Sequence, residues 1–298
     1  MIWLVAPLLA ALFQAWRTAV QQRVRAELSL NAAGLVRYLY GLPVSLALLG
    51  GWTLWRGTAP GWGDGAVLGW CLAAGLAQIV GTNLLLMAFA QRNFVAGTAY
   101  AKTEAIQGAI LSLVLLGETL HPLSWAGIAL GVGGVMTLSS DGRGWRLADL
   151  AQGAALCGLG AGFGFTLTAI FVKLATRGLG LGDPILAALT ALVMVQAGQV
   201  LMQGSYVLIR EREQAWRVVR TWRRSAQVGL LAALGSACWF TGFATAPVAL
   251  VRTVGQIEVV FTIGFSRLYL RESPTRRDIQ GLLLVGGGVM LALAGFLL

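Results

Sequence analysis

The chain has 298 residues, of which 57% are hydrophobic and only 11% are charged, and its formal net charge is +10. A chain with so little polar surface cannot cover an ordinary soluble domain, which excludes that class. The basic residues stand in short connections between apolar stretches and not on one face of a soluble fold, so their expected partner is the anionic surface of membrane lipids and not nucleic acid.

Apolar stretches long enough to cross a bilayer recur along the whole chain. A hydrocarbon core of about 30 Å takes roughly 20 apolar residues in a helix, and the helix is forced because lipid offers backbone groups no water. With charged residues, proline and glycine as boundaries, five spans are predicted near residues 2–20, 32–55, 66–90, 94–116 and 123–139. Five more are predicted near residues 147–175, 185–209, 226–246, 248–270 and 279–298. The sequence therefore predicts an all-α polytopic membrane protein with ten transmembrane helices.

The two groups of five spans are related by a weak internal repeat. Residues 117–136 align with residues 271–290 at an offset of 154 positions, and seven of the twenty pairs are identical. The same offset pairs Glu104 with Glu258. A repeat with an odd number of spans inserts its second copy upside down, as in many secondary carriers. We therefore expect two inverted five-helix repeats, residues 1–140 and 141–298, joined at the polar connection 139–145 and working by alternating access around a site near the midplane.

The arginines in the connections predict an orientation. Connections after the odd-numbered spans hold fourteen arginines, whereas the other connections hold only Arg56 and Arg177. The positive-inside rule then places both termini away from the cytoplasm. We expect an integral protein of a bacterial inner (plasma) membrane.

One of these connections has an amphipathic pattern. In residues 210–224, Trp216, Val219 and Trp222 recur at roughly helical spacing among arginines. Such a pattern is typical of a short helix in the lipid headgroup region, and a regulatory docking site is the alternative interpretation.

Two short motifs resemble a known family. The run Leu-Leu-Gly-Glu-Thr-Leu at residues 115–120, followed by Gly127 and by Gly-Val-Gly-Gly-Val-Met at 131–136, resembles the end of an EamA repeat of the drug/metabolite transporter superfamily. Residues 269–290 resemble the same element, and Leu-Val-Arg-Tyr at 35–38 is similar to the second span of such repeats. The resemblance covers nearly the whole chain and implies a carrier of metabolites or drugs with a central cavity. It also implies cytoplasmic termini, against the arginine pattern.

Two acidic residues are the leading candidates for function. Glu104 and Glu258 each stand ten residues into a predicted span, near the bilayer centre. An ionised carboxylate there costs several kcal/mol unless it is paired, hydrated or protonated. Each glutamate can therefore bind a proton and a cationic solute group in turn, which would couple transport to the proton gradient.

Other polar residues in the predicted spans complete the candidate site. Lys102 and Arg252 do not share the acidic face of their own helices, so they are expected either to hold an anionic group of the solute or to pair with another span. The remaining candidates are polar or aromatic residues expected to line the site, although amides in membranes often bond neighbouring helices: Tyr100, Gln107, Gln256, Asn83 and Trp239.

The pattern as a whole predicts a secondary active transporter. The solute would be a small organic cation or zwitterion, such as an amino acid, an amine or a drug, and protons would be the coupling ion. Phosphate loops, nucleophile elbows, zinc signatures and dinucleotide fingerprints are absent from the sequence, so no enzyme activity, cofactor or metal is expected. Two alternatives remain: an uncoupled exchanger of anionic or zwitterionic metabolites, and a membrane assembly subunit that transports nothing.

Overall fold

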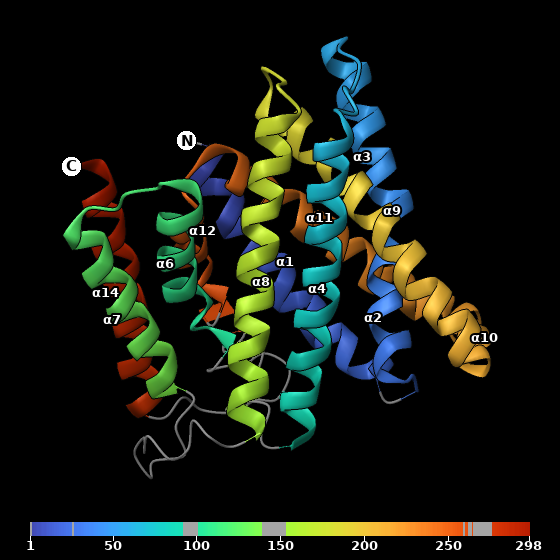
Figure 1. Cartoon of the computed structure of the whole chain (residues 1–298). Helices are drawn as coiled ribbons and strands as arrows, with labels where there is room; N and C mark the ends of the chain where they lie inside the picture. The colour runs from blue at the N-terminus through green and yellow to red at the C-terminus, as the bar shows by residue number, and fades with distance from the viewer. Residues whose placement is uncertain are drawn as a thin grey trace. The chain divides into compact units, whose positions relative to one another are not determined.

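All regular structure in the described part of the chain is α-helical. The computed structural model describes residues 2–25, 27–91, 101–138, 153–258, 260–261, 264 and 276–298. Figure 1 shows the helices, whose bounds are α1 (Ile2–Arg25), α2 (Leu30–Leu39), α3 (Gly41–Arg56), α4 (Gly65–Gln91), α6 (Glu104–Leu116), α7 (Pro122–Leu138), α8 (Gly153–Gly178), α9 (Pro184–Arg210), α10 (Arg212–Arg220), α11 (Trp222–Thr245), α12 (Val248–Gly255) and α14 (Arg276–Leu297).

Six described segments are long and apolar enough to cross a membrane. They are Leu30–Arg56, Gly65–Ala88, Ala155–Gly178, Pro184–Arg210, Trp222–Thr245 and Ile279–Leu297. Three shorter apolar helices, Ile2–Thr18, Glu104–Leu116 and Pro122–Thr137, each overlap one further predicted span, and Glu104–Leu116 covers only the second half of the span predicted at residues 94–116. The prediction of an all-helical polytopic membrane protein is therefore confirmed, whereas the number of ten spans stays a prediction. The predicted join at residues 139–145 lies outside the described residues.

Local sequence explains where these helices begin and end. Asp183 caps α9 because its side chain accepts hydrogen bonds from the backbone of Ile185 and Leu186, and Pro184 occupies the first turn, where its missing N–H costs nothing. Helices α3 and α6 end at Gly57 and Gly117, both in the left-handed conformation that glycine adopts without strain.

The chain divides into two compact units, and each takes one segment from each half of the sequence. Unit 1 comprises Met1–Ile79 and Thr168–Ala246, and unit 2 comprises Val80–Leu167 and Pro247–Leu298. Helices α4 and α8 are both divided between the units.

In unit 1, helix α11 packs along α1, and α9 contacts α2, α3, α10 and α11. Leu49, Leu186, Leu189 and Val193 form one apolar cluster of this unit. Three buried glutamines of α9, Gln196, Gln199 and Gln203, bond Ser45, Gln78 and the backbone of Asn31 respectively. These bonds between helices satisfy polar groups that lipid cannot satisfy.

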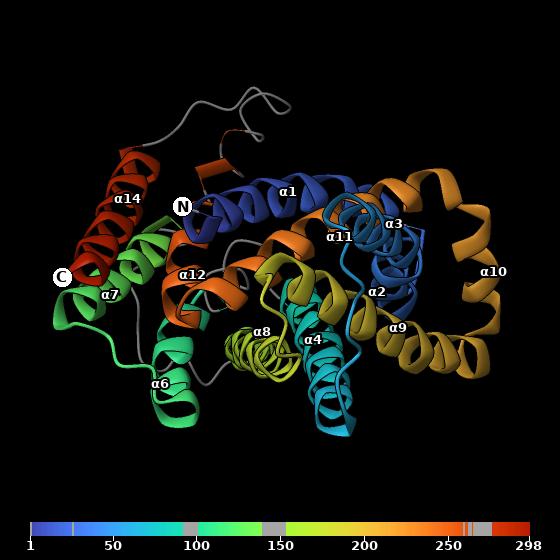
Figure 2. The ribbon, with the colours of Figure 1, turned by 90° about the horizontal axis from the view of Figure 1, so that it is seen from above.

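In unit 2, helices α7 and α14 lie side by side, as Figures 1 and 2 both show, and α12 contacts α6, α7 and α14. The contact between α7 and α14 is close because glycines face each other across it. A side chain at Gly288 would collide with the backbone of Gly127 and Gly131. Ala105, Ala109, Ile128, Val132 and Ala249 form the apolar core between α6, α7 and α12.

Candidate functional site

Two interruptions of the helices in unit 2 position the charged candidates. Lys102 and Thr103 form a turn directly before α6, which begins at Glu104. Gln256 and Ile257 form a turn directly after α12, and Glu258 is helical again. The two turns are separated by the same 154 positions as the sequence repeat. Each glutamate therefore follows a break in its predicted span, although continuous helices were expected over residues 94–116 and 248–270.

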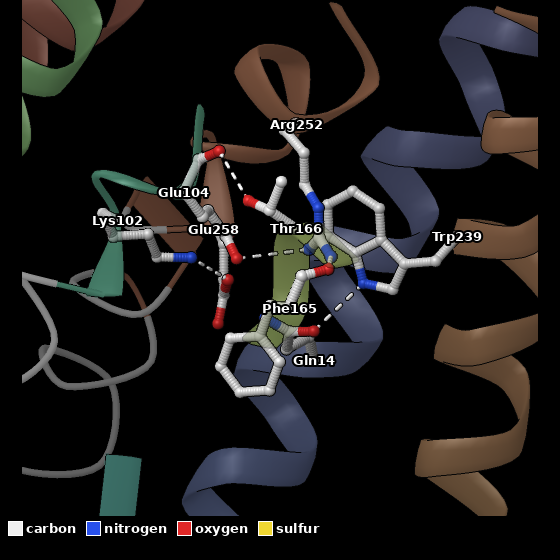
Figure 3. A network of polar contacts seen from close by, with 8 residues as sticks. All are labelled: Gln14, Lys102, Glu104, Phe165, Thr166, Trp239, Arg252 and Glu258. Atoms are coloured by element: carbon white, nitrogen blue, oxygen red, sulfur yellow. Dashed lines mark hydrogen bonds and ion pairs between the residues drawn. The ribbon is translucent and has the colours of Figure 1, made fainter. Parts of the chain in front are cut away.

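The four charged candidates form two buried ion pairs. Nζ of Lys102 lies 2.5 Å from Oε2 of Glu258, and Nη1 of Arg252 lies 3.4 Å from Oε2 of Glu104 (Figure 3). All four residues are 7–8% exposed. Burying four charges without partners would be prohibitive, so the pairing accounts for their presence in an apolar helical unit.

Neither cation pairs with the acid of its own predicted span, in agreement with the sequence-based interpretation. The partners are 156 residues apart in the Lys102–Glu258 pair and 148 residues apart in the Arg252–Glu104 pair. The angle computed for Lys102 does not apply, because this residue lies in the turn and not on α6. The cations were expected either to hold an anionic group of the solute or to pair with another span, and in the structure each cation pairs with an acid of another predicted span.

Helix α8 supplies two contacts that the sequence analysis missed. Nη2 of Arg252 donates to the carbonyl oxygen of Phe165 at 2.8 Å, and Oγ1 of Thr166 donates to the carbonyl oxygen of Glu104 at 3.1 Å. A carbonyl has no side-chain signature, so Phe165 was not predictable as a partner. The close approach of α8 does have a signal in the sequence, because glycines occupy every second position from 158 to 164. A Cβ at Gly162 would stand 2.9 Å from the carbonyl oxygen of Ala101, so this glycine allows α8 to approach the turn before α6.

The two glutamine candidates have different surroundings. Gln107 donates from Nε2 to Oγ1 of Thr103 at 3.0 Å and to the carbonyl oxygen of Leu159 at 3.3 Å, so it fixes the turn before α6. Gln256 is 2% exposed, and neither atom of its amide has a hydrogen-bond partner within the described part of the chain. Its Oε1 lies directly over Gly131 of α7, where a side chain would collide with it.

The remaining candidates are dispersed. Asn83 is half-buried on α4, in unit 2. Trp239 belongs to unit 1, where its indole Nε1 donates to Oε1 of Gln14 at 3.0 Å and its ring stacks on Phe243. This contact is the interhelical bond that the sequence analysis gave as the alternative to a wall residue. Tyr100 lies outside the described residues.

The arrangement is suited to binding charged groups and not to covalent chemistry. In the described ranges, no three His, Cys, Asp or Glu side chains come together as a metal site would require. The pairs bring two carboxylates and two cations into one buried cluster with no net charge. A ligand that offers both a cationic and an anionic group can exchange with such partners and leave no charge unpaired.

The long apolar helices, with buried charges among them, define a polytopic integral membrane protein. The chain matches the EamA-like transporter family twice, over residues 1–140 and over residues 152–294, and it belongs to that family. The resemblance found in the sequence motifs is thereby confirmed. A membrane transporter contacts lipids and a small-molecule substrate.

Comparison with solved structures shows the fold independently. One match, described as "Crystal structure of protein", superposes with a TM-score of 0.73 at 17% identity, and the alignment covers 100% of this chain and 96% of that one. At this identity the likeness shows a shared fold alone. No curated protein matches the chain.

Proposed function

We propose that this protein is a secondary active transporter that moves a small organic solute by alternating access, and that the solute is a zwitterion such as an amino acid. The proposed architecture is ten spans in two inverted repeats, residues 1–140 and 141–298. Support comes from the two family matches, which fall in these two ranges, and from the 154-residue offset that relates both the glutamates and the turns before them.

The two buried ion pairs carry this proposal. Lys102 and Glu104 belong to the first proposed repeat, and Glu258 and Arg252 belong to the second, so each pair joins one repeat to the other. Alternating access moves one repeat against the other, and these contacts must then break or be replaced. A solute that supplies replacement partners lowers the free-energy cost of that movement. Transport requires such a difference, because a solute shifts a conformational equilibrium only if it interacts differently with the two conformations.

A zwitterion fits this cluster better than a cation does. A solute ammonium that takes Glu104 from Arg252 leaves a buried guanidinium without its acid, and a solute carboxylate can replace that acid. A purely cationic solute offers no such replacement. Arg252 also has the Phe165 carbonyl as a second acceptor at 2.8 Å, so the Arg252–Glu104 pair, at 3.4 Å, is the one that opens at lower cost.

Proton coupling is the proposed energy source. A proton on Glu258 removes its charge and leaves the ammonium of Lys102 available to a solute carboxylate. Binding of the proton and binding of the solute then favour each other. In the alternative, an uncoupled exchanger, the glutamates keep their charge and the cations alone determine the affinity for the solute.

Counterflow in liposomes that contain only this protein tests the proposal. The vesicles are loaded with an unlabelled mixture of the twenty common amino acids, and entry of an isotope-labelled mixture is followed by mass spectrometry. Choline, which does not cross lipid unaided, serves as the probe for a purely cationic solute. We expect counterflow of at least one labelled amino acid and no counterflow of choline. The amino acid counterflow should be lost in Glu104→Gln. Absence of any counterflow from folded protein would reject the transport proposal.

A pH gradient across the same vesicles tests the coupling. An inward proton gradient should change the rate in the wild type, and Glu258→Gln should abolish that response. Equal rates with and without the gradient in the wild type would favour the uncoupled exchanger.

A reporter fused to the carboxyl terminus and expressed in bacteria tests the proposed location in the inner membrane and the orientation of the termini. A cytoplasmic signal would reject the orientation predicted from the arginines.

A further inference from the structure

Helix α10 presents an exposed surface that the transport proposal does not use. The helix comprises Arg212–Arg220 and follows α9 after one residue, Glu211. Trp216 and Val219 on α10, and Trp222 at the start of α11, are 54–64% exposed. Basic side chains surround these three apolar residues. Arg212, Arg217, Arg220, Arg223 and Arg224 are all exposed.

The charge of this surface is strongly positive even after its ion pairs are taken into account. Arg217 pairs with Glu213 at 2.7 Å and Arg224 pairs with Glu27 at 2.6 Å. Within the described part of the chain no carboxylate lies within ion-pair distance of Arg212, Arg220 or Arg223, although the Arg223 guanidinium lies 5.5 Å from the ring centroid of Trp222. An anionic partner is thus the one that complements the surface.

The length of α9 places this surface at the depth of lipid headgroups. Helix α9 has 27 residues and is therefore about 40 Å long, close to the thickness of a bilayer with its headgroups. Its first end carries Asp183, whose carboxylate binds Trp52 and Arg56. Helix α10 begins directly beyond the other end, so its tryptophans and arginines are suited to the interface.

The buried face of α10 is bonded to both ends of α2, within unit 1. At the start of α2, the Glu211 carboxylate accepts hydrogen bonds from the Ser29 hydroxyl and from Nδ2 of Asn31, and Gln214 accepts from the Ser29 backbone N–H at 3.0 Å. At the end of α2, the Tyr40 hydroxyl donates to the carbonyl oxygen of Val218 at 3.0 Å.

An apolar contact reinforces these bonds. Val218 is 1% exposed and packs in one cluster with Ala32, Val36 and Val228. Any ligand that holds α10 in place therefore also holds α2.

We propose that α10 and the first turn of α11 form a docking surface for anionic phospholipid headgroups, and that lipid bound there stabilises α2. The arginines Arg212, Arg220 and Arg223 bind headgroup phosphates, and Trp216, Val219 and Trp222 enter the interface between them. Phosphatidylglycerol should bind more tightly than phosphatidylcholine, since the choline lipid has no net charge.

Native mass spectrometry of the purified full-length protein measures the lipid preference. Detergent-solubilised protein is titrated with phosphatidylglycerol or with phosphatidylcholine of the same acyl chains, and inorganic phosphate is added in a separate arm. The test variant is Arg220→Gln/Arg223→Gln. The control variant, Arg56→Gln/Arg177→Gln, removes the same charge from two exposed arginines outside α10 and α11.

Each arginine near an anionic surface contributes about 1 kcal/mol, so the test variant should lose roughly thirtyfold in affinity for phosphatidylglycerol, and the control variant should lose little. Phosphatidylcholine binding should not change, and inorganic phosphate should not displace the lipid. Equal binding of both lipids by the wild type, or equal loss in both variants, would overturn the docking surface.

Hydrogen exchange measures the effect on α2. Adding phosphatidylglycerol should slow amide exchange in peptides that cover residues 29–40 of the wild type, and it should have no such effect in the Arg220→Gln/Arg223→Gln variant. Lipid binding without any change in this segment would overturn the link to α2.

Discussion

Nζ of Lys102 lies 2.5 Å from Oε2 of Glu258, although the two residues are 156 positions apart in the chain and neither is more than 8% exposed. Each residue stands at a break in a predicted span: Lys102 lies within the turn before α6, and Glu258 directly follows the turn after α12. A residue in a turn is not restricted to one face of a helix. The break is therefore what allows a lysine and a glutamate of separate segments to meet.

The first prediction concerns the free energy of this pair. Lys102→Met and Glu258→Met each leave one buried charge without its partner, so each should destabilise the protein by roughly 3–5 kcal/mol. The double variant should lose much less than the sum of the two, because no unpaired charge remains. Denaturant unfolding of the four proteins in detergent measures this cycle, and additive losses would mean that the pair contributes nothing in solution.

The second prediction concerns Arg252, which contacts two acceptors at once through separate guanidinium nitrogens. Arg252→Lys keeps the charge, but one ammonium cannot reproduce the planar contact with both Glu104 and Phe165. We expect a folded protein whose amino acid counterflow falls about tenfold or more, because a misplaced binding group is costly. Arg177→Lys, at an exposed position of α8, is the matched control. Wild-type counterflow in Arg252→Lys would show that the charge alone suffices.

The lengths of the apolar stretches predicted most helix positions well, but they did not predict the breaks in two of the spans. The span predicted at residues 185–209 matches α9, since its Asp183 cap and its apolar run give independent signals. The spans predicted at 94–116 and 248–270 are interrupted at 102–103 and 256–257. Neither turn contains proline or glycine, although Gly255 directly precedes the second turn, and apolar length alone did not mark the breaks.

The four charged candidates stood out in the sequence, but their contacts did not. Intramembrane charges are rare and costly, which made Glu104, Glu258, Lys102 and Arg252 visible in the sequence. The pairing of each cation with its acid depends on the helix breaks and on the close approach of α8. The periodicity of the sequence predicts neither of these features. Trp239 shows the same limit, because an indole and the amide of Gln14 satisfy each other only once the packing of α1 and α11 is known.

The third prediction uses two glycines of α14 that differ only in their surroundings. A Cβ at Gly288 would collide with the backbone of Gly131, whereas Gly286 has nothing within 4 Å of the same position. Gly288→Ala should therefore destabilise the protein by about 1–3 kcal/mol through overpacking. Gly286→Ala should be neutral or stabilising by up to roughly 1 kcal/mol, since alanine favours the helix. Thermal unfolding compares the two, and equal effects would exclude a close contact between α7 and α14.

The fourth prediction concerns Asp183, at the end of α9 opposite α10. Its Oδ2 accepts from the indole of Trp52 at 2.8 Å and lies 3.5 Å from Nε of Arg56, and its Oδ1 accepts from the backbone of Ile185 at 2.9 Å. Partial burial alone would raise the pKa of this carboxyl, but the hydrogen bonds from Trp52, Ile185 and Leu186 and the charge of Arg56 together lower the pKa below its ordinary value.

A lowered pKa fixes the sign of the pH dependence. The ionised carboxylate stabilises the folded state fully above the ordinary aspartate pKa of about 3.9, and this stabilisation is lost as the pH falls through the lower pKa of the folded state. Asp183→Asn keeps a capping side chain but not the charge, so it should melt below the wild type from pH 8 to 5, and the difference should shrink below about pH 4. Asp183→Ala also loses the cap and should cost about 1 kcal/mol more at every pH. A difference between the wild type and Asp183→Asn that widens in acid would contradict the assignment, because it would mean that the folded state favours the protonated carboxyl.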